Sequence, residues 1–299
     1  MHVFVTGASG HIGSAVVDEL LEAGHRVTGL ARSDTSAAAL TAKGVEVHRG
    51  DLGDLDGLRA AAAAADGVIH LAYRDDFDND FVGAAETDLR VVNAMGEVLA
   101  GSDRPLVNTS GTLLLAGVAQ GRTATENDVA EAGPRIDSEN ATIAMAERGV
   151  RSSVVRLSPL VHSRPDHHGF AHRLIDIARE KGVAAYVGDG SNRWPAVHTL
   201  DAARLYRLAV EAAPAGTRLH GVADEGVPFR EIAALIGRHL DLAVASISAE
   251  EAYEHFGFLS VFGSLDNPTS SALTQKVLDW HPDGPGLIED LDAGHYFQQ

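Results

Sequence analysis

The first half of the chain alternates short apolar runs with longer segments in which apolar residues recur every three to four positions. Short runs apolar on both faces are typical of buried strands, and the longer period is typical of amphipathic helices. Strands are predicted at 2–6, 26–31, 45–49, 68–72, 106–109 and 153–157. Helices are predicted at 12–23, 35–42, 55–65, 78–100 and 137–148. This alternation predicts an α/β fold of the Rossmann type, a doubly wound parallel sheet covered by helices on both faces.

The rhythm changes after Pro159, where a stretch rich in His and Pro at 161–169 precedes an amphipathic segment at 170–181. A further helix is predicted at 201–213, and a strand at 219–223 is expected to rejoin the sheet. The remainder mixes short helices with loops rich in Pro and Gly, which suits a smaller substrate-binding region. The predicted division is a Rossmann domain of residues 1–163 with 199–223, and a C-terminal substrate region of residues 164–198 and 224–299.

Composition narrows the range of partners. Apolar residues make up 45% of the 299 and charged residues 22%, as in ordinary globular proteins. The formal net charge of −18 repels phosphate backbones and anionic lipids, so neither nucleic acid nor a membrane is an expected partner. With no cysteine, the chain has no disulfide, thiolate nucleophile or cysteine-ligated zinc. The start shows no signal-like segment, so we expect a cytoplasmic protein, and a homodimer is left open.

A glycine loop lies between the first predicted strand and the first helix, with the sequence TGASGHIG at 6–13. Glycine at positions 7 and 10 permits a tight turn and close approach to a pyrophosphate, and Gly13 lets the helix pack closely on the strand. The alternative is a plain strand-to-helix turn. The motif predicts dinucleotide contacts from Gly7, Ser9, Gly10, His11, Ile12 and Gly13.

The end of the second strand is where such folds read the adenosine ribose. Arg32 stands there in place of an acidic residue, and it can pair with a 2′-phosphate to which Ser33 can donate. This favours NADP over NAD, although Asp34 works against it and Arg32 is alternatively a solvated cation. After the third strand, Asp51 and Leu52 are expected near the adenine, unless Asp51 only caps a turn.

Further segments resemble the short-chain dehydrogenase/reductase superfamily, on its extended or atypical branch. They are the TGxxGxxG loop, the run GVIHLA at 67–72, NTSGT at 108–112, VVRLSPLVH at 154–162 and WPAVHTLD at 194–201. The resemblance implies further cofactor contacts from Leu71, Ala72, Tyr73, Thr109, Pro159 and Leu160.

In that superfamily a Tyr and a Lys four residues later carry out the proton chemistry, and here the pair is missing. Arg135 stands at the tyrosine position and Glu139 at the lysine position. None of the five tyrosines has a lysine four residues on. Arg135 and Glu139 either pair with each other on one helical face, or Arg135 supplies a fixed positive charge to a substrate oxyanion or carboxylate.

Other residues must then serve in catalysis. Ser110 matches the superfamily serine and Thr112 is its neighbour, although both also suit a turn that bonds its own backbone. His162 lies near the expected nicotinamide position and is the predicted titratable donor, with Tyr73 a weaker candidate. The histidines at 162–172 do not have metal-ligand spacing, so no metal site is expected.

These features together predict an NADP(H)-dependent atypical oxidoreductase. Its substrate would be a small or medium apolar carbonyl or a related unsaturated compound. The missing pair keeps open a non-catalytic dinucleotide sensor or regulatory protein, and, less strongly, an epimerase or lyase with bound nicotinamide. Aromatic residues such as Trp194, Phe256 and Trp280 are expected in the core or in an apolar substrate pocket.

Overall fold

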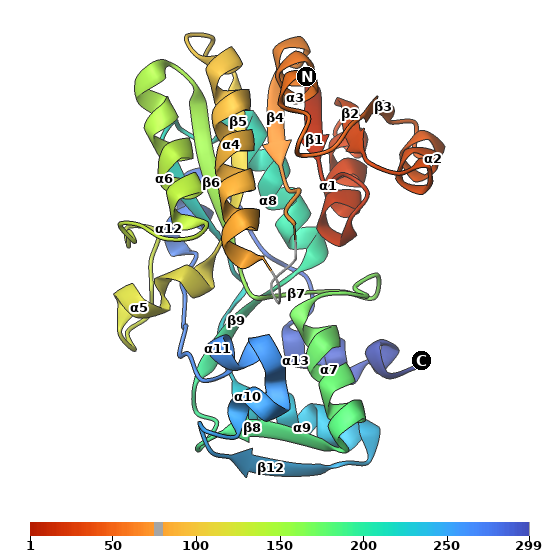
Figure 1. The fold of residues 1–299 in the computed structure, drawn as a ribbon, viewed down its shortest axis with the longest axis vertical. Coiled ribbons are helices and arrows are strands. Elements are labelled where there is room, and N and C mark those ends of the chain that lie inside the picture. Colours follow the sequence, from red (N-terminus) through yellow and green to blue (C-terminus); the bar gives the residue numbers. More distant parts are fainter. Residues whose placement is uncertain (75–79, 299) are drawn as a thin grey trace.

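The computed structural model describes residues 1–74 and 80–298 and shows two closely joined parts (Figure 1). A parallel sheet with helices on both faces forms one part, and a smaller region with short strands and helices forms the other. The α/β, doubly wound fold expected from the sequence is confirmed.

The large sheet has seven strands within the described residues, in the order β10-β6-β5-β4-β1-β2-β3. Every neighbouring pair is parallel. The strands are β1 (His2–Thr6), β2 (Arg26–Ala31), β3 (Glu46–Arg49), β4 (Gly67–His70), β5 (Pro105–Gly111), β6 (Arg151–Leu157) and β10 (Thr217–Gly221). Strand order reverses between β1 and β4, and ligands of such sheets bind at the carboxyl ends of the strands at this point.

Helices cover both faces of the sheet. On one face lie α1 (His11–Glu22), α2 (Asp34–Ala42) and α8 (Thr199–Ala212), and on the other lie α3 (Leu55–Ala64), α4 (Phe81–Leu99) and α6 (Ile136–Ala144). Shorter turns are η1 (Thr112–Leu115), α5 (Ala116–Ala119) and η2 (Met145–Arg148). The start expected for the fourth helix, Asp78, lies outside the described residues.

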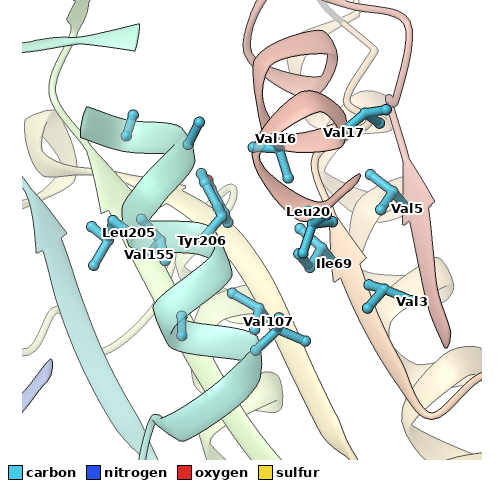
Figure 2. Close-up of a cluster of buried hydrophobic side chains, with 14 of the residues drawn as sticks. Val3, Val5, Val16, Val17, Leu20, Ile69, Val107, Val155, Leu205 and Tyr206 are labelled. Atoms are coloured by element: carbon cyan, nitrogen blue, oxygen red, sulfur yellow. The ribbon is translucent and has the colours of Figure 1, made fainter. Parts of the chain in front are cut away.

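The core beneath α1 and α8 joins the two halves of the sheet (Figure 2). Val16, Val17 and Leu20 recur at helical spacing on α1, are fully buried, and pack in one cluster with the valines of β1. Tyr206 of α8 lies beside Val107 of β5 in the same cluster. Removing this apolar surface from water stabilises the stacking of the helices on the sheet.

The smaller region contains two more sheets. Strands β7 (Leu160–His162), β9 (Arg193–His198) and β11 (Asp224–Pro228) form one, and β8 (Val183–Val187) pairs in parallel with β12 (Ala243–Ile247) in the other. The helices of the smaller region are α7 (Phe170–Lys181), α9 (Phe229–Leu240), α10 (Ala252–Phe256), α11 (Ser260–Gly263) and α13 (Leu287–Asp292), with 3₁₀ turns η3 (Gly257–Leu259) and η4 (His295–Phe297). Helix α12 (Ala272–Leu278) instead packs against β10 and α8 of the large sheet.

Buried aromatic residues hold this region together. Trp194 is fully buried, and its ring centre lies 5.1 Å from that of Phe229 in an edge-to-face pair. Phe256 belongs to the same cluster, and Trp280 joins the core of the sheet. These aromatic residues are therefore core residues, one of the two roles expected for them.

Several elements have other bounds than expected; α6, for example, ends at Ala144 rather than at 148. Helix α8 begins at Thr199 rather than at 201, and the stretch at 161–169 contains part of strand β7. The fourth strand ends at His70, two residues early, because the amides of Leu71 and Ala72 both donate to the Thr6 hydroxyl, each over 3.2 Å. The strand expected at 219–223 does rejoin the sheet, as β10 beside β6.

Close packing of α1 on the glycine loop predicts the effect of a methyl group at Gly13. A Cβ at Gly13 would lie 2.0 Å from the Gly7 carbonyl oxygen, which is backbone and cannot turn away. We expect Gly13→Ala to destabilise the protein by about 2 kcal/mol, as overpacking does. Gly117→Ala is the control, because a Cβ there meets open space. Equal thermal midpoints for the two variants would contradict the packing argument.

Candidate functional site

A cleft of about 890 Å³ opens at the carboxyl ends of the strands, where the strand order reverses. Its volume lies in the range of small-molecule and cofactor sites. Residues predicted from the sequence to bind the dinucleotide form much of its wall: Gly7, Ser9, Gly10, Arg32, Asp51, Leu52, Leu71, Ala72 and Tyr73.

The glycine loop leaves no room for side chains. Gly7 has φ +69°, and a Cβ there would lie 2.8 Å from the Ala72 nitrogen, so only glycine lets the loop approach the turn after β4. Gly10 precedes α1 without a side-chain cap, and the first turn has no acidic residue. The first amides of α1 therefore remain available, and with the helix dipole they suit a phosphate group. These residues fit a dinucleotide pyrophosphate.

A buried chain of hydrogen bonds supports this loop from below. The Thr6 hydroxyl accepts the two amides after β4, so its own proton goes to His70 Nδ1, 2.6 Å away. His70 therefore carries its proton on Nε2 and donates it to Asp88, over 3.1 Å. Burial acts to raise the pKa of Asp88, but the bond from His70 and the nearby charge of Arg135 hold it below its usual value. An ionised Asp88 thus orients the turn that faces the cleft.

The cleft wall beside the end of β2 carries an arginine that is unpaired among the described residues. Arg32 lines the cleft and is exposed, and it forms no ion pair with any residue that the structure describes. Asp34, expected to weaken this positive site, is held by Arg49, which donates over 2.8 Å. Asp51 lines the cleft and also accepts the Gly53 amide over 2.7 Å, so it serves as the turn residue as well.

Other predicted cofactor residues lie outside the cleft wall. Ser33 caps α2 and accepts the Ser36 amide over 3.1 Å. Thr109 donates to the His70 carbonyl and meets the Tyr206 hydroxyl at 2.8 Å. Residues without direct lining contact are His11, Ile12, Gly13, Ser33, Thr109, Pro159 and Leu160. Their cofactor contacts stay predictions, and Leu160 is itself a core residue.

Arg135 takes up an unusual backbone conformation at the start of α6. Its φ of +65° is uncommon for a residue with a side chain and costs on the order of 1–2 kcal/mol. The guanidinium is held in place, with its carbon 3.9 Å from the centre of the Tyr73 ring and its Nη2 donating to the Thr109 carbonyl over 2.9 Å. Its Nε is buried and has no hydrogen-bond partner among the residues that the structure describes. A fixed cation thus lies beside the cleft residue Tyr73.

Glu139 does not form an ion pair with Arg135. The expectation that the two side chains pair on one face of the helix is therefore wrong. Arg156, itself buried, donates to both Glu139 oxygens over 3.1 Å from its Nε, and Arg218 donates over 2.8 Å. Burial acts to raise the pKa of Glu139, but these arginines lower it below its usual value. Arg135 is the N-cap of α6, so its side chain leaves the helix and faces Tyr73 instead.

The other candidate catalytic residues are buried in different surroundings. Among the described residues the buried Ser110 hydroxyl has no hydrogen-bond partner at normal distance, although it lies near enough to Glu139 to help lower that pKa. Thr112 is fully buried and accepts from Asn267 over 3.1 Å. His162 is fully buried on β7, bonded to Asp290 over 2.9 Å, and it does not line the cleft. Their catalytic roles stay predictions.

Sequence reasoning missed four polar residues of the cleft wall. They are Ser36, Arg74, Thr87 and Arg90. Arg90 is exposed, donates to the Thr87 hydroxyl over 2.9 Å, and forms no ion pair in the described part of the chain. Arg90 could have been found from its position on the helix after the fourth strand, because that helix flanks the ligand-binding crevice in such folds.

Residues 1–74 and 80–298 contain neither a metal-binding cluster nor a membrane-spanning helix. No group of three or more metal-ligating side chains in those ranges is placed to hold an ion. No described helix combines the length and the apolar character needed to span a bilayer.

Comparison with known proteins agrees with this geometry. The family description "NAD dependent epimerase/dehydratase family" matches residues 3–220. The chain belongs to this family. The expected likeness to the extended branch of short-chain dehydrogenases/reductases is thereby confirmed.

The similar proteins differ in how well their functions are known. An uncharacterized protein of Schizosaccharomyces pombe, C2A9.02, is 50% identical over 99% of this chain and 100% of its own. A 2-alkyl-3-oxoalkanoate reductase of Stenotrophomonas maltophilia is 28% identical over 78% of this chain and 73% of its own. A dTDP-glucose 4,6-dehydratase of Streptomyces venezuelae, solved with NAD, has a TM-score of 0.80 at 18% identity, covering 100% of this chain and 97% of its own. The last likeness shows the shared fold.

The buried pairing of Glu139 predicts a large effect of removing its charge. Glu139→Gln leaves Arg156 buried without its counter-ion, and we expect a loss of about 3 kcal/mol in the free energy of unfolding at neutral pH. Because the folded pKa of Glu139 is lowered, its stabilisation is present above the ordinary carboxyl pKa and is lost as pH falls through the folded value. The gap between wild type and variant should therefore shrink in acid.

Urea unfolding at neutral and acidic pH measures both effects. Glu147→Gln, an exposed glutamate shortly after α6, is the control. A gap that stays constant between neutral pH and pH about 3, below the usual carboxyl range, would contradict the ion-pair account.

Proposed function

We propose that this family member is an NADP(H)-dependent oxidoreductase. The observation that carries the proposal is Arg32, an unpaired cation at the ribose end of the cleft, with the nearby carboxylate of Asp34 already held by Arg49. A guanidinium in this position suits the 2′-phosphate that distinguishes NADP from NAD. Arg90 makes the same wall more positive, whereas the charge of Arg74 is paired with Asp80 over 2.9 Å. The chain as a whole is strongly negative.

The proposed reaction is reduction of a small or medium apolar carbonyl compound, or the reverse oxidation. The relative named as a reductase of 2-alkyl-3-oxoalkanoates supports this class of substrate. A bound nicotinamide supplies or accepts the hydride. The task left to the chain is to position the carbonyl and stabilise the negative charge that develops on its oxygen.

Arg135 is the residue proposed for that charge. It occupies the position of the missing tyrosine, and its guanidinium is fixed by the Thr109 carbonyl and the Tyr73 ring. A guanidinium stays charged near neutral pH, so it stabilises an oxyanion without giving up a proton. Ser110 is proposed to contact the same oxygen. His162 stays the proton donor predicted from the sequence, although it is fully buried beside Asp290 and does not line the cleft.

A second candidate is a dinucleotide sensor without turnover. It is favoured by Glu139, because the residue at the lysine position of the family pair is engaged by two arginines and does not face the cleft. A sensor must distinguish the two redox states of its ligand, whereas an enzyme must bind both. Binding constants therefore separate the two functions.

Titration with NADPH, NADP⁺, NADH and NAD⁺ at one salt concentration is the first test. We expect comparable affinity for NADPH and NADP⁺, and Arg32→Ala should weaken NADPH about 10- to 100-fold, since a lost charged hydrogen bond costs about 1.5–3 kcal/mol, with little effect on NADH. Arg26→Ala, a mostly exposed arginine of β2, is the control. Equal losses for NADPH and NADH would refute the NADP preference, and absence of all binding would refute the function.

The proposed role of Arg135 predicts that its removal lowers kcat without unfolding the protein. We expect Arg135→Met to lower kcat about 100-fold, the usual cost of losing one oxyanion donor, while NADPH affinity changes little. Arg148→Met, an exposed arginine just after α6, should behave as wild type. Steady-state kinetics on a 2-alkyl-3-oxo acid together with thermal unfolding measure this. A fall in thermal stability with unchanged kcat would assign Arg135 a structural role only.

A further inference from the structure

Tyr73 lies in the part of the cleft wall that follows β4, the strand next to β5. The backbone just before it is fixed, because the amides of Leu71 and Ala72 both donate to the Thr6 hydroxyl, each over 3.2 Å. The Tyr73 side chain is partly exposed, and its hydroxyl oxygen is shielded from solvent. A titratable O–H group is therefore held at a defined place in the cleft wall.

The register of the strands brings Tyr73 to the same edge of the sheet as Ser110. Strands β4 and β5 are parallel neighbours, and His70 is paired in register with Asn108. Tyr73 follows His70 by three residues, and Ser110 follows Asn108 by two. Both residues thus lie at the carboxyl ends of adjacent strands, where ligands of such sheets bind.

Arg135 connects these two strand ends. Its guanidinium carbon lies 3.9 Å from the centre of the Tyr73 ring. Its Nη2 donates over 2.9 Å to the carbonyl of Thr109, the residue before Ser110. A guanidinium over the face of an aromatic ring is attracted by the ring, and its charge favours the deprotonated form of a phenol. The cation and the phenol therefore form one unit, contributed by the start of α6 and by the chain after β4.

Among the described residues of the cleft wall, Tyr73 is the side chain best suited to give up a proton to a carbonyl oxygen beside β5. Arg32, Arg74 and Arg90 stay charged and do not donate a proton near neutral pH. Asp51 follows β3 at one edge of the sheet, away from the ends of β4 and β5. No histidine lines the cleft in the part of the chain that the structure describes.

We propose that Tyr73 donates the proton in the reduction, with Arg135 as the cation that stabilises the phenolate left behind. The inference rests on the proposed function and names the donor for its proton. Hydride from the reduced nicotinamide forms the new C–H bond at the carbonyl carbon. The C=O double bond becomes a single bond, its oxygen takes the proton as the phenol O–H bond breaks, and the phenolate regains a proton from water. A tyrosine and a cation thus act together, although the tyrosine comes from the end of β4.

The charges around the phenol act in both directions. Burial raises the pKa of Tyr73 most, Arg135 lowers it, Asp88 raises it and Arg74 lowers it, and the net pKa lies above the ordinary value. The phenol is therefore protonated near neutral pH, as a donor must be. Such a weak acid releases its proton only if the charge that forms is stabilised. The guanidinium of Arg135 is fixed where that charge develops, so it costs no rearrangement during the reaction.

The test is Tyr73→Phe, which removes the hydroxyl and keeps the ring against the guanidinium. We expect kcat for NADPH-dependent reduction of a 2-alkyl-3-oxo acid to fall about 100- to 1000-fold, within the usual contribution of a general acid. NADPH affinity and the thermal midpoint should stay near those of wild type, because the ring packing is retained. Tyr253→Phe is the matched control, since this tyrosine is 74% exposed, and it should behave as wild type.

A double variant tests whether the two residues act as one unit. Tyr73→Phe combined with Arg135→Met should lose little more activity than the more damaged single variant, because each residue works through the other. Losses that multiply, or a Tyr73→Phe enzyme with the kcat of wild type, would overturn the inference and leave the proposed function intact. Wild type that binds NADPH and NADP⁺ without any turnover would overturn the proposed function, and the inference with it.

The absorbance of the phenolate gives a second readout that needs no substrate. It is recorded after a rapid rise in pH, before the chain unfolds, and the signal of Tyr73 is the difference between a protein and its Tyr73→Phe form. The titration of Tyr73 should move to higher pH in Arg135→Met and stay in place in Arg148→Met. An unchanged titration in Arg135→Met would show that the guanidinium does not stabilise the phenolate, and would overturn the inference.

Discussion

The close approach of the glycine loop to the turn after β4 is the constraint on which the cleft depends. Gly7 has no room for a side chain because the backbone of Leu71 and Ala72 lies against it. The Thr6 hydroxyl fixes this contact by accepting both amides, and the chain through His70 to Asp88 fixes the hydroxyl. One buried polar network thus sets the shape of the cleft floor, and the helices and lining side chains are arranged around it.

Much of the fold followed from the sequence because its signals are local. Strands apolar on both faces and helices with spaced apolar residues specify a parallel sheet with covered faces, and β1, β2 and α7 have the bounds expected. The smaller region was harder, because β8 and β12 are short strands that pair with each other across a long stretch of chain. Pairing at that separation has no local signature.

The site divides in the same way. Backbone contacts to a dinucleotide depend on glycine spacing, and Gly7, Gly10 and Arg32 line the cleft. Side-chain roles depend on tertiary packing, which the sequence does not show. Arg135 and Glu139 are four residues apart, yet a left-handed backbone at Arg135 directs it to Tyr73, and Glu139 is held by arginines of β6 and β10. His162 was expected in a loop but lies on β7, because that strand forms only by pairing with the distant β9.

The place of β10 at one edge of the sheet has a consequence for the order in which the protein can fold during synthesis. Strand β6 pairs with β10, and the intervening chain makes much of the smaller region before it returns. Until β10 and α8 leave the ribosome, β6 is paired only with β5 and its other side is open, and the cluster around Val107 lacks Tyr206. A nascent chain that ends before residue 199 therefore presents an open strand and a partly uncovered core, the surfaces on which chaperones act.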